Sequence, residues 1–183
     1  MKYKIFTTLC FVALLPNVCI SAEKKMYGAH ENVRLPEIGV EVPAKLDTGA
    51  KTASLSARDI KYFKRNGKRW VSFSLAIEGN NHRVIEKPLA GIDHILRRAA
   101  DRAPNDKEMY TVRPVILLSV CIGKTSRTIE VNLTDRSAFT YPFLFGATAL
   151  KEFGGTVDPS LEYTAGNPEC ISVAQARKQT PSP

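Results

Sequence analysis

Alternation of apolar and polar residues marks the centre of the chain. Every second residue from Val71 to Ile77 is large and apolar, which is the period of a half-buried strand. The pair Asn66-Gly67 lies just before this run, and Asn-Gly is the strongest short signal for a hairpin turn. The pattern therefore predicts a hairpin in which residues 60–63 pair with residues 70–77.

A second hairpin follows the same logic. The largely apolar stretch 114–122 leads into Gly123 and Lys124, and apolar residues then alternate with polar ones over 129–133. Together with the strand that enters Asp47, two hairpins favour a compact barrel or sandwich.

Between the hairpins, apolar residues from Ile92 to Ala103 recur at helical spacing. This stretch is expected to form a short helix or a mobile excursion from the barrel, and a flap is expected between Glu86 and Thr111. Its basic residues are interpreted as a solvated face. From Pro159 onward, Pro, Gly, Ser and polar residues predict an extended tail with a loose end.

The first 22 residues have the order of a secretory signal. A positive start at Lys2 and Lys4 precedes a short apolar run, and small residues follow at Ser21 and Ala22. The run is shorter than the roughly 20 residues that cross a bilayer. We therefore expect cleavage after Ala22, export to the periplasm or the medium, and no membrane span in the mature chain.

The 183 residues suit one well-cored domain, predicted over 23–166, with 167–183 as the tail. Loss of Lys2 and Lys4 with the signal leaves 24 of the 26 basic residues against 18 acidic ones, a net charge of +6. Such a charge favours acidic substrates or anionic envelope polymers, and export argues against nucleic acid as the partner. Cys121 and Cys170 remain in the mature chain and can form one disulfide in an oxidising compartment.

The segment 44–50, Ala-Lys-Leu-Asp-Thr-Gly-Ala, is the strongest candidate for chemistry. An apolar strand delivers Asp47 into a tight loop, and Gly49 lets the backbone turn closely beneath it. Two such carboxylates can face each other and share one proton, so that one activates water and the other protonates a carbonyl. Asp-Thr-Gly alone is a weak signal, because Asp and Gly are common turn residues. Asp135 is a second acid that a monomeric site could use, although a turn residue paired with Arg136 is the favoured interpretation.

In this context the chain resembles the bacterial retropepsin-like aspartic peptidases that are often labelled putative ATP-dependent zinc proteases. The resemblance runs from about Tyr27 to Gly166. It is carried by Leu35-Pro36-Glu37 with Gly39, by 44–52, Ser54-Leu55, 67–71, 113–116, and Leu144-Phe145-Gly146 before Ala149-Leu150.

The resemblance implies a mainly β fold, a closed barrel of the acid-protease type with one short C-terminal helix. It also implies that Asp47 is the catalytic acid in a loop with Thr48, Gly49 and Ala50, and that Phe145-Gly146 supports this loop. One Asp-Thr-Gly per chain then requires a homodimer, in which Thr48 ties one loop to the other.

Two positions depart from the family pattern, with Ser56 where relatives often have histidine and Ala147 where they often have arginine. His30, His82 and His94 lack metal-ligand spacing and are interpreted as surface residues, and no Walker-type loop is present. We therefore expect no metal and no other cofactor. The sequence supports two functions, an aspartic endopeptidase acting on protein or peptide substrates in the envelope, and a non-catalytic module that binds peptides or cell-wall fragments on the same fold. A zinc peptidase is the least favoured of the three functions.

Overall fold

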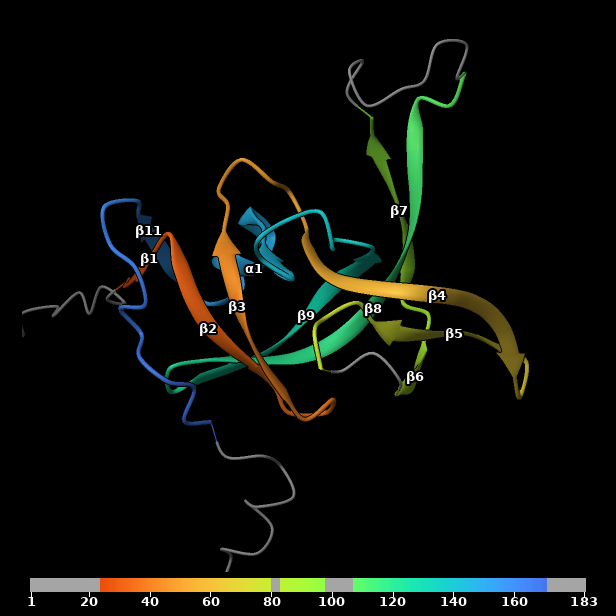
Figure 1. Ribbon diagram of the computed structural model, residues 1–183, viewed down its shortest axis with the longest axis horizontal. Coiled ribbons are helices and arrows are strands. Elements are labelled where there is room, and N and C mark those ends of the chain that lie inside the picture. Colours follow the sequence, from red (N-terminus) through yellow and green to blue (C-terminus); the bar gives the residue numbers. More distant parts are fainter. Residues whose placement is uncertain (1–23, 80–82, 98–106, 171–183) are drawn as a thin grey trace, which may run out of the picture.

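A computed structural model describes residues 24–79, 83–97 and 107–170 (Figure 1). The predicted signal, His82 and the final residues 171–183 lie outside this range. The strands are β1 Lys25–Gly28, β2 His30–Leu35, β3 Val40–Leu46, β4 Ala53–Arg65, β5 Lys68–Leu75, β6 Val84–Pro88, β7 Gly91–Leu96, β8 Tyr110–Ile122, β9 Thr125–Thr134, β10 Phe143–Phe145 and β11 Gly155–Asp158, with one helix, α1 Ala147–Glu152. No helix in the described part of the chain is long and apolar enough to cross a membrane.

Six strands close into a barrel in the order β10-β3-β2-β8-β9-β4, because β10 pairs with both β3 and β4. The pairing of β3 with β10 and that of β4 with β9 are parallel. Apolar side chains fill the interior, and the largest fully buried ones include Phe73, Phe143 and Phe145. The mainly β barrel with one short helix, expected from the resemblance, is confirmed.

Both predicted hairpins are present. Strands β4 and β5 pair antiparallel around Asn66 and Gly67. Both turn residues have positive φ, because a two-residue turn that matches the twist of its strands requires this conformation. β8 and β9 pair in full register around Gly123. A register shift between Arg58 and Lys61 bends β4, so the second half of the β4–β5 hairpin leaves the barrel, as Figure 1 shows.

The prediction of a helix after Ile92 is wrong for the residues that the structure describes. Residues Gly91–Leu96 form strand β7, and each of them pairs with a residue of β8. The spacing of Ile92, Ile95 and Leu96 fits a helix, but the free edge of β8 supplies backbone partners that local sequence does not reveal. Figure 1 shows β7 and the start of β8 rising from the barrel as a strand pair, within the region where a flap was expected.

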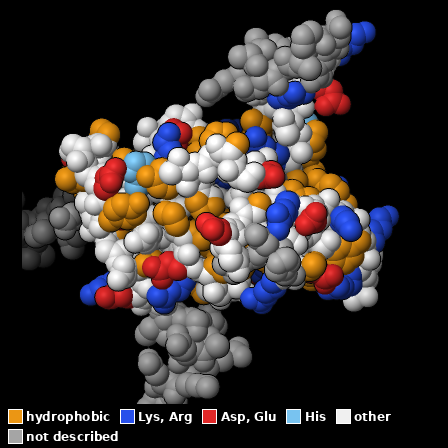
Figure 2. All heavy atoms as spheres, viewed as in Figure 1, with side chains coloured by type: hydrophobic (Ala, Val, Ile, Leu, Met, Phe, Trp, Pro, Cys, Tyr) orange, Lys and Arg blue, Asp and Glu red, His pale blue; other side chains and the backbone are white. Residues whose placement is uncertain are grey.

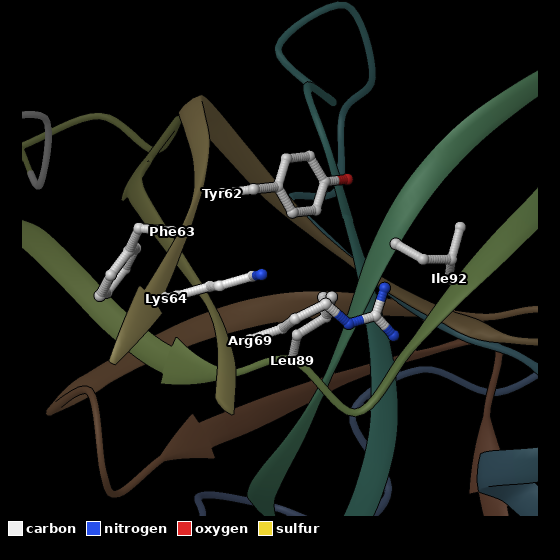
Figure 3. A pocket seen from close by; sticks show the side chains of 6 residues that line it. All are labelled: Tyr62, Phe63, Lys64, Arg69, Leu89 and Ile92. Atoms are coloured by element: carbon white, nitrogen blue, oxygen red, sulfur yellow. The ribbon is translucent and has the colours of Figure 1, made fainter. Parts of the chain in front are cut away.

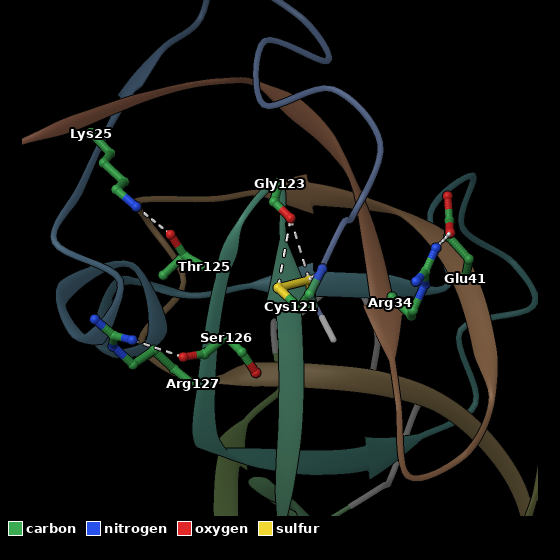
Figure 4. The surroundings of a disulfide bond; sticks show 9 residues. Lys25, Arg34, Glu41, Cys121, Gly123, Thr125, Ser126 and Arg127 are labelled. Atoms are coloured by element: carbon green, nitrogen blue, oxygen red, sulfur yellow. Dashed lines mark hydrogen bonds and ion pairs between the residues drawn. A yellow bond between two sulfur atoms is a disulfide. The ribbon is translucent and has the colours of Figure 1, made fainter. Parts of the chain in front are cut away.

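The segment after β11 is fixed to the barrel as far as Cys170. Tyr163 donates a backbone hydrogen bond to the carbonyl of His30, and Glu169 donates one to that of Gly123. Cys121 and Cys170 are joined by a disulfide (Figure 4). We call residues 159–170 the C-terminal strap. The part of the tail that the structure describes is therefore not loose.

The strap depends on a fully buried carboxylate. Glu31 accepts hydrogen bonds from the backbone N–H groups of Gly28, Thr164 and Ala165 and from the Thr164 hydroxyl. A buried carboxylate is stable when its oxygens are fully hydrogen-bonded. Glu31 therefore joins the strap to β2 at the position next to His30.

Candidate active site

Asp47 lies immediately after β3, at one end of the barrel. Its backbone N–H donates to the carbonyl of Phe145 at 2.8 Å, which continues the β3–β10 ladder by one bond. Its Oδ1 accepts the Gly49 N–H at 3.0 Å, so the side chain closes its own turn. The other oxygen, Oδ2, lies 3.7 Å from the Lys45 ammonium, and 31% of the side chain is exposed. The carboxylate is thus fixed in position and open to solvent on one side.

The segment after β10 supports the loop from the other side. The N–H groups of Ala147 and Thr148 donate to the carbonyls of Ala50 and Lys51. Gly146 passes so close to Thr52 that a Cβ there would lie 2.5 Å from the Thr52 carbonyl oxygen. Phe145 is fully buried. Phe145 and Gly146 therefore lie where the resemblance expects a support, and no larger residue fits at 146.

A cavity of about 710 Å³ opens beside Asp47. Its walls come from β2, β3, β7 and β8 and from the loop between β9 and β10. The charged and aromatic residues that line it, besides Asp47, are His30, Lys45, Arg113, Arg136, Phe139 and Tyr141. Ile95 of β7 also reaches this cavity, which places the β7–β8 strand pair over the site.

Arg136 is 8% exposed and holds the cavity wall together. Its Nε donates to the Tyr141 carbonyl and its NH1 to the Ser54 hydroxyl, while its guanidinium lies over the Phe139 ring. Burial lowers the pKa of Arg136, the charge of Arg113 lowers it further, and Asp47 opposes both. The guanidinium and the Asp47 carboxylate are therefore close enough to interact electrostatically.

Arg113 is the second partly buried cation. Burial lowers its pKa and the charge of Asp93 opposes this. Its NH1 lies 3.4 Å from Oδ1 of the buried Asn132, and its Nε is buried without a hydrogen-bond partner. An arginine normally remains charged even when its pKa falls. The cavity thus gathers Lys45, Arg113 and Arg136 around a single carboxylate.

His30 is held on the opposite wall. Its Nδ1 lies 2.8 Å from Glu162 of the strap, and its ring stacks on Tyr141 at 4.3 Å. Only 20% of the side chain is exposed, so His30 is a partly buried residue of the cavity wall. His94 is exposed, as expected.

Other candidates lie away from Asp47. Asp135 is a turn residue, but its partner is the Ser137 N–H and not Arg136, and this hydrogen bond lowers the pKa of Asp135. Asp135 lines a different hollow, below β4. Thr48 is exposed on the side of Ala147 and Lys151, outside the Asp47 cavity.

The residues that the structure describes do not fit a zinc site. Ser56, at the position where the resemblance expects histidine, is fully buried; its hydroxyl donates to the Ala76 carbonyl and accepts the Arg136 N–H. No group of three or more His, Cys, Asp or Glu side chains in the described ranges could hold a metal ion.

Sequence reasoning missed most of the cavity wall. His30, Arg113, Arg136 and Tyr141 lie 17 to 94 residues from Asp47 along the chain, and only the barrel brings them together. A signal existed for Arg113, because it is the one charge in the apolar strand 111–118. No comparable signal existed for His30 or Tyr141.

The closed barrel and the supported Asp-Thr-Gly loop define a retropepsin-like domain. A family model described as "RimB-like: Retropepsin-like aspartic endopeptidase RimB" matches residues 26–168. The chain belongs to this RimB-like family.

Similar proteins extend the comparison. The chain is 31% identical over 157 residues to a probable alpha-L-glutamate ligase of Shewanella pealeana and 29% identical over 161 residues to one of Desulfotalea psychrophila. These matches cover 85% and 86% of this chain but only 33% of each relative. A crystal structure of a protein of unknown function from Legionella pneumophila is 34% identical, with a TM-score of 0.62, and the match covers 76% of this chain and 97% of that one.

Proposed function

We propose that this protein is a homodimeric aspartic endopeptidase that hydrolyses protein or peptide substrates with Asp47 from each of two copies. The observation that carries the proposal is the position of Asp47, in a loop fixed by Phe145 and Gly49 at the mouth of a cavity large enough for peptide side chains. Family membership supports it. The relatives named as glutamate ligases are about three times as long as the match, so their name carries no reaction over to this chain.

A second copy is required because Asp47 is the one carboxylate among the described residues that line its cavity. Asp135 lies elsewhere, and an isolated carboxylate cannot divide the acid and base roles. Two carboxylates at close range share one proton, because both cannot ionise together. Thr48 and Gly49 are exposed, which leaves the loop accessible to its counterpart in the second copy.

In this dyad the ionised carboxylate takes a proton from water, and the hydroxide attacks the scissile carbonyl carbon. The protonated carboxylate gives its proton to the carbonyl oxygen, which yields a neutral tetrahedral diol. When the C–N bond breaks, the carboxylic acid that took the proton from water gives it to the amine nitrogen. One hydroxyl of the diol gives its proton back to the other carboxylate, which restores the dyad. Ile95 contributes by excluding water above the site.

The charge of the cavity favours acidic peptides. Lys45, Arg113 and Arg136 face it, and Arg113 Nε has no protein partner. A carboxylate side chain of the substrate would supply acceptors for these cations, and such charge-assisted bonds are stronger than neutral ones. The expected substrate therefore carries Asp or Glu beside the scissile bond.

The test is Asp47→Asn, compared with the unmodified protein on quenched fluorescent peptides that contain or lack glutamate. We expect the variant to keep its far-UV circular dichroism and melting temperature and to lose cleavage by at least about a thousandfold, because it removes both the base and the shared proton. Light scattering should give twice the mass of one chain at the protein concentrations at which the peptides are cleaved. Cleavage that survives in the variant would contradict the proposal.

A non-catalytic binding module is the second candidate, and the crowding of cations around a lone carboxylate favours it. With Lys45 at 3.7 Å, a single Asp47 is already paired within its own chain. A protein that stays monomeric at all concentrations, binds glutamate-containing peptides and never cleaves them would establish this function instead.

We also propose that the mature protein is exported. The signal-like start and the Cys121–Cys170 disulfide support this, since disulfides persist in oxidising compartments. Mass spectrometry of the expressed protein should find a chain that begins after Ala22; a full-length cytoplasmic chain with free thiols would contradict it.

A further inference from the structure

The β4–β5 hairpin carries an unusual density of positive charge. Six of the thirteen residues from 58 to 70 are basic, and three others are aromatic. The strand register sets Lys64 opposite Arg69 and Arg65 opposite Lys68. Like charges directly opposite each other destabilise a strand pair. Figure 2 shows Lys and Arg side chains gathered over the outer end of this hairpin, at the right of the molecule.

On one face of the hairpin, Arg65 is compensated by groups of the protein itself. Arg65 forms an ion pair with Glu86 of β6, and its guanidinium lies 5.3 Å from the Phe63 ring centre and 4.6 Å from that of Trp70. Such cation–π contacts and the ion pair hold the arginine in place. Arg65 therefore needs no further counter-charge from a ligand.

The opposite face differs. Tyr62, Lys64 and Arg69 point from the hairpin toward Ile92, while Phe63 points the other way (Figure 3). Together with Leu89 they surround a mainly apolar hollow of about 320 Å³. Neither Lys64 nor Arg69 has an ion-pair partner among the described residues. Two facing cations without a counter-charge thus stand at the rim of an apolar hollow.

We propose that this face, formed by Tyr62, Lys64, Arg69, Leu89 and Ile92, is a peptide-binding site that takes an apolar side chain next to an acidic one. The hollow would bury the apolar side chain, and the neighbouring carboxylate would neutralise the repulsion between Lys64 and Arg69. Charge complementarity and shape both select this ligand. A bilayer is a poorer fit, because membrane surfaces take up protruding apolar side chains and this surface is concave.

The site lies along a path to Asp47. Tyr62 also lines the hollow below β4, and Arg113 lines both that hollow and the Asp47 cavity. An extended peptide advances about 3.3 Å per residue, so several residues of one chain can span adjacent hollows. The occupant is therefore a distal part of the substrate itself; this link, unlike the binding site, rests on the proposed peptidase function.

The experiment measures binding without cleavage, in the full-length Asp47→Asn protein. The probes are two fluorescein-labelled peptides, one with a phenylalanine flanked by two glutamates on each side, and one with serine in place of the phenylalanine. We expect the phenylalanine probe to bind about tenfold more tightly by fluorescence anisotropy, which is the gain from burying one apolar side chain. The double variant Lys64→Glu with Arg69→Glu should abolish this preference.

The matched control is Lys61→Glu with Lys68→Glu, which makes the same change in net charge on the opposite face of the same hairpin. It should keep the tenfold preference, with affinity for both probes lowered only slightly by the weaker overall field. Circular dichroism of both double variants checks that the hairpin remains folded. Because cleavage is not measured, failure of the peptidase proposal would leave this result unchanged.

Three outcomes would overturn the inference. The first is equal binding of the two probes to the Asp47→Asn protein. The second is an equal loss of preference in both double variants, which would show general electrostatic attraction. The third is binding to phosphatidylglycerol vesicles that depends on Lys64 and Arg69 while neither peptide binds, which would identify the face as a membrane contact.

Discussion

At the scale of single residues, the guanidinium of Arg136 holds two parts of the cavity wall together. It connects β4, through the Ser54 hydroxyl, to the Tyr141 carbonyl, and so fixes the loop that carries Tyr141 against the barrel. The planar guanidinium reaches both acceptors at once, which a lysine ammonium cannot do in the same geometry. Arg136 is therefore a positioning residue for the cavity wall as well as a source of positive charge.

Replacing Arg136 should lower the stability of the folded protein. We expect Arg136→Ala to lower the free energy of unfolding by about 2 to 4 kcal/mol, because the Ser54 hydroxyl and the Tyr141 carbonyl lose a buried charged donor. Arg136→Lys should recover less than half of this loss. Urea unfolding measures both. Arg34→Ala is the control, since its ion pair with Glu41 is half exposed and should contribute no more than about 1 kcal/mol. Equal effects of the two alanine variants would contradict this role.

At the scale of elements, the short strand β10 and the C-terminal strap position the site. β10 is three residues long, yet it pairs with β3 on one side and β4 on the other, and so closes the barrel beside Asp47. The strap passes along β2 and places Glu162 on His30. Neither element has the periodicity of a long strand or helix, so local pattern gave little indication of their importance.

The strap should loosen when Glu31 changes. In Glu31→Gln, one carboxylate oxygen becomes an NH2 group that faces either the Ala165 N–H or the donors on the other oxygen, so a donor meets a donor. We expect the free energy of unfolding to fall by about 1 to 3 kcal/mol. Amide hydrogen exchange should speed up at 163–165 more than in β8. Unchanged exchange in the strap would contradict the role assigned to Glu31. Glu152→Gln, at an exposed position, is the control.

At the scale of the whole molecule, the barrel is held by pairings between distant segments. The disulfide closes a loop of 49 residues between the end of β8 and the end of the strap. Figure 4 shows it beside the turn at Gly123, whose carbonyl accepts the Glu169 N–H. The Glu31 hydrogen bonds therefore hold the strap at its middle, and the disulfide holds it at its C-terminal end.

Removing the disulfide should lower stability through the unfolded state. For a loop of this length, the chain-entropy relation gives a loss of about 4 kcal/mol at most. We expect Cys121→Ser with Cys170→Ser to melt at a lower temperature by differential scanning calorimetry, and the unmodified protein to match it after complete reduction. If reduction leaves the melting temperature unchanged, the disulfide does not contribute to stability.

The sequence by itself determined the two hairpins and the Asp47 loop, because alternation, an Asn-Gly turn and an Asp-Thr-Gly motif act within a few neighbouring residues. The resemblance supplied barrel closure. Only the tertiary structure decided that Gly91–Leu96 is a strand, since its partner β8 begins 14 residues after β7 ends. It also decided that His30, Arg113, Arg136 and Tyr141 share one cavity. Both outcomes depend on pairing between distant segments. Local patterns of hydrophobicity and charge do not show which distant residues will be in contact.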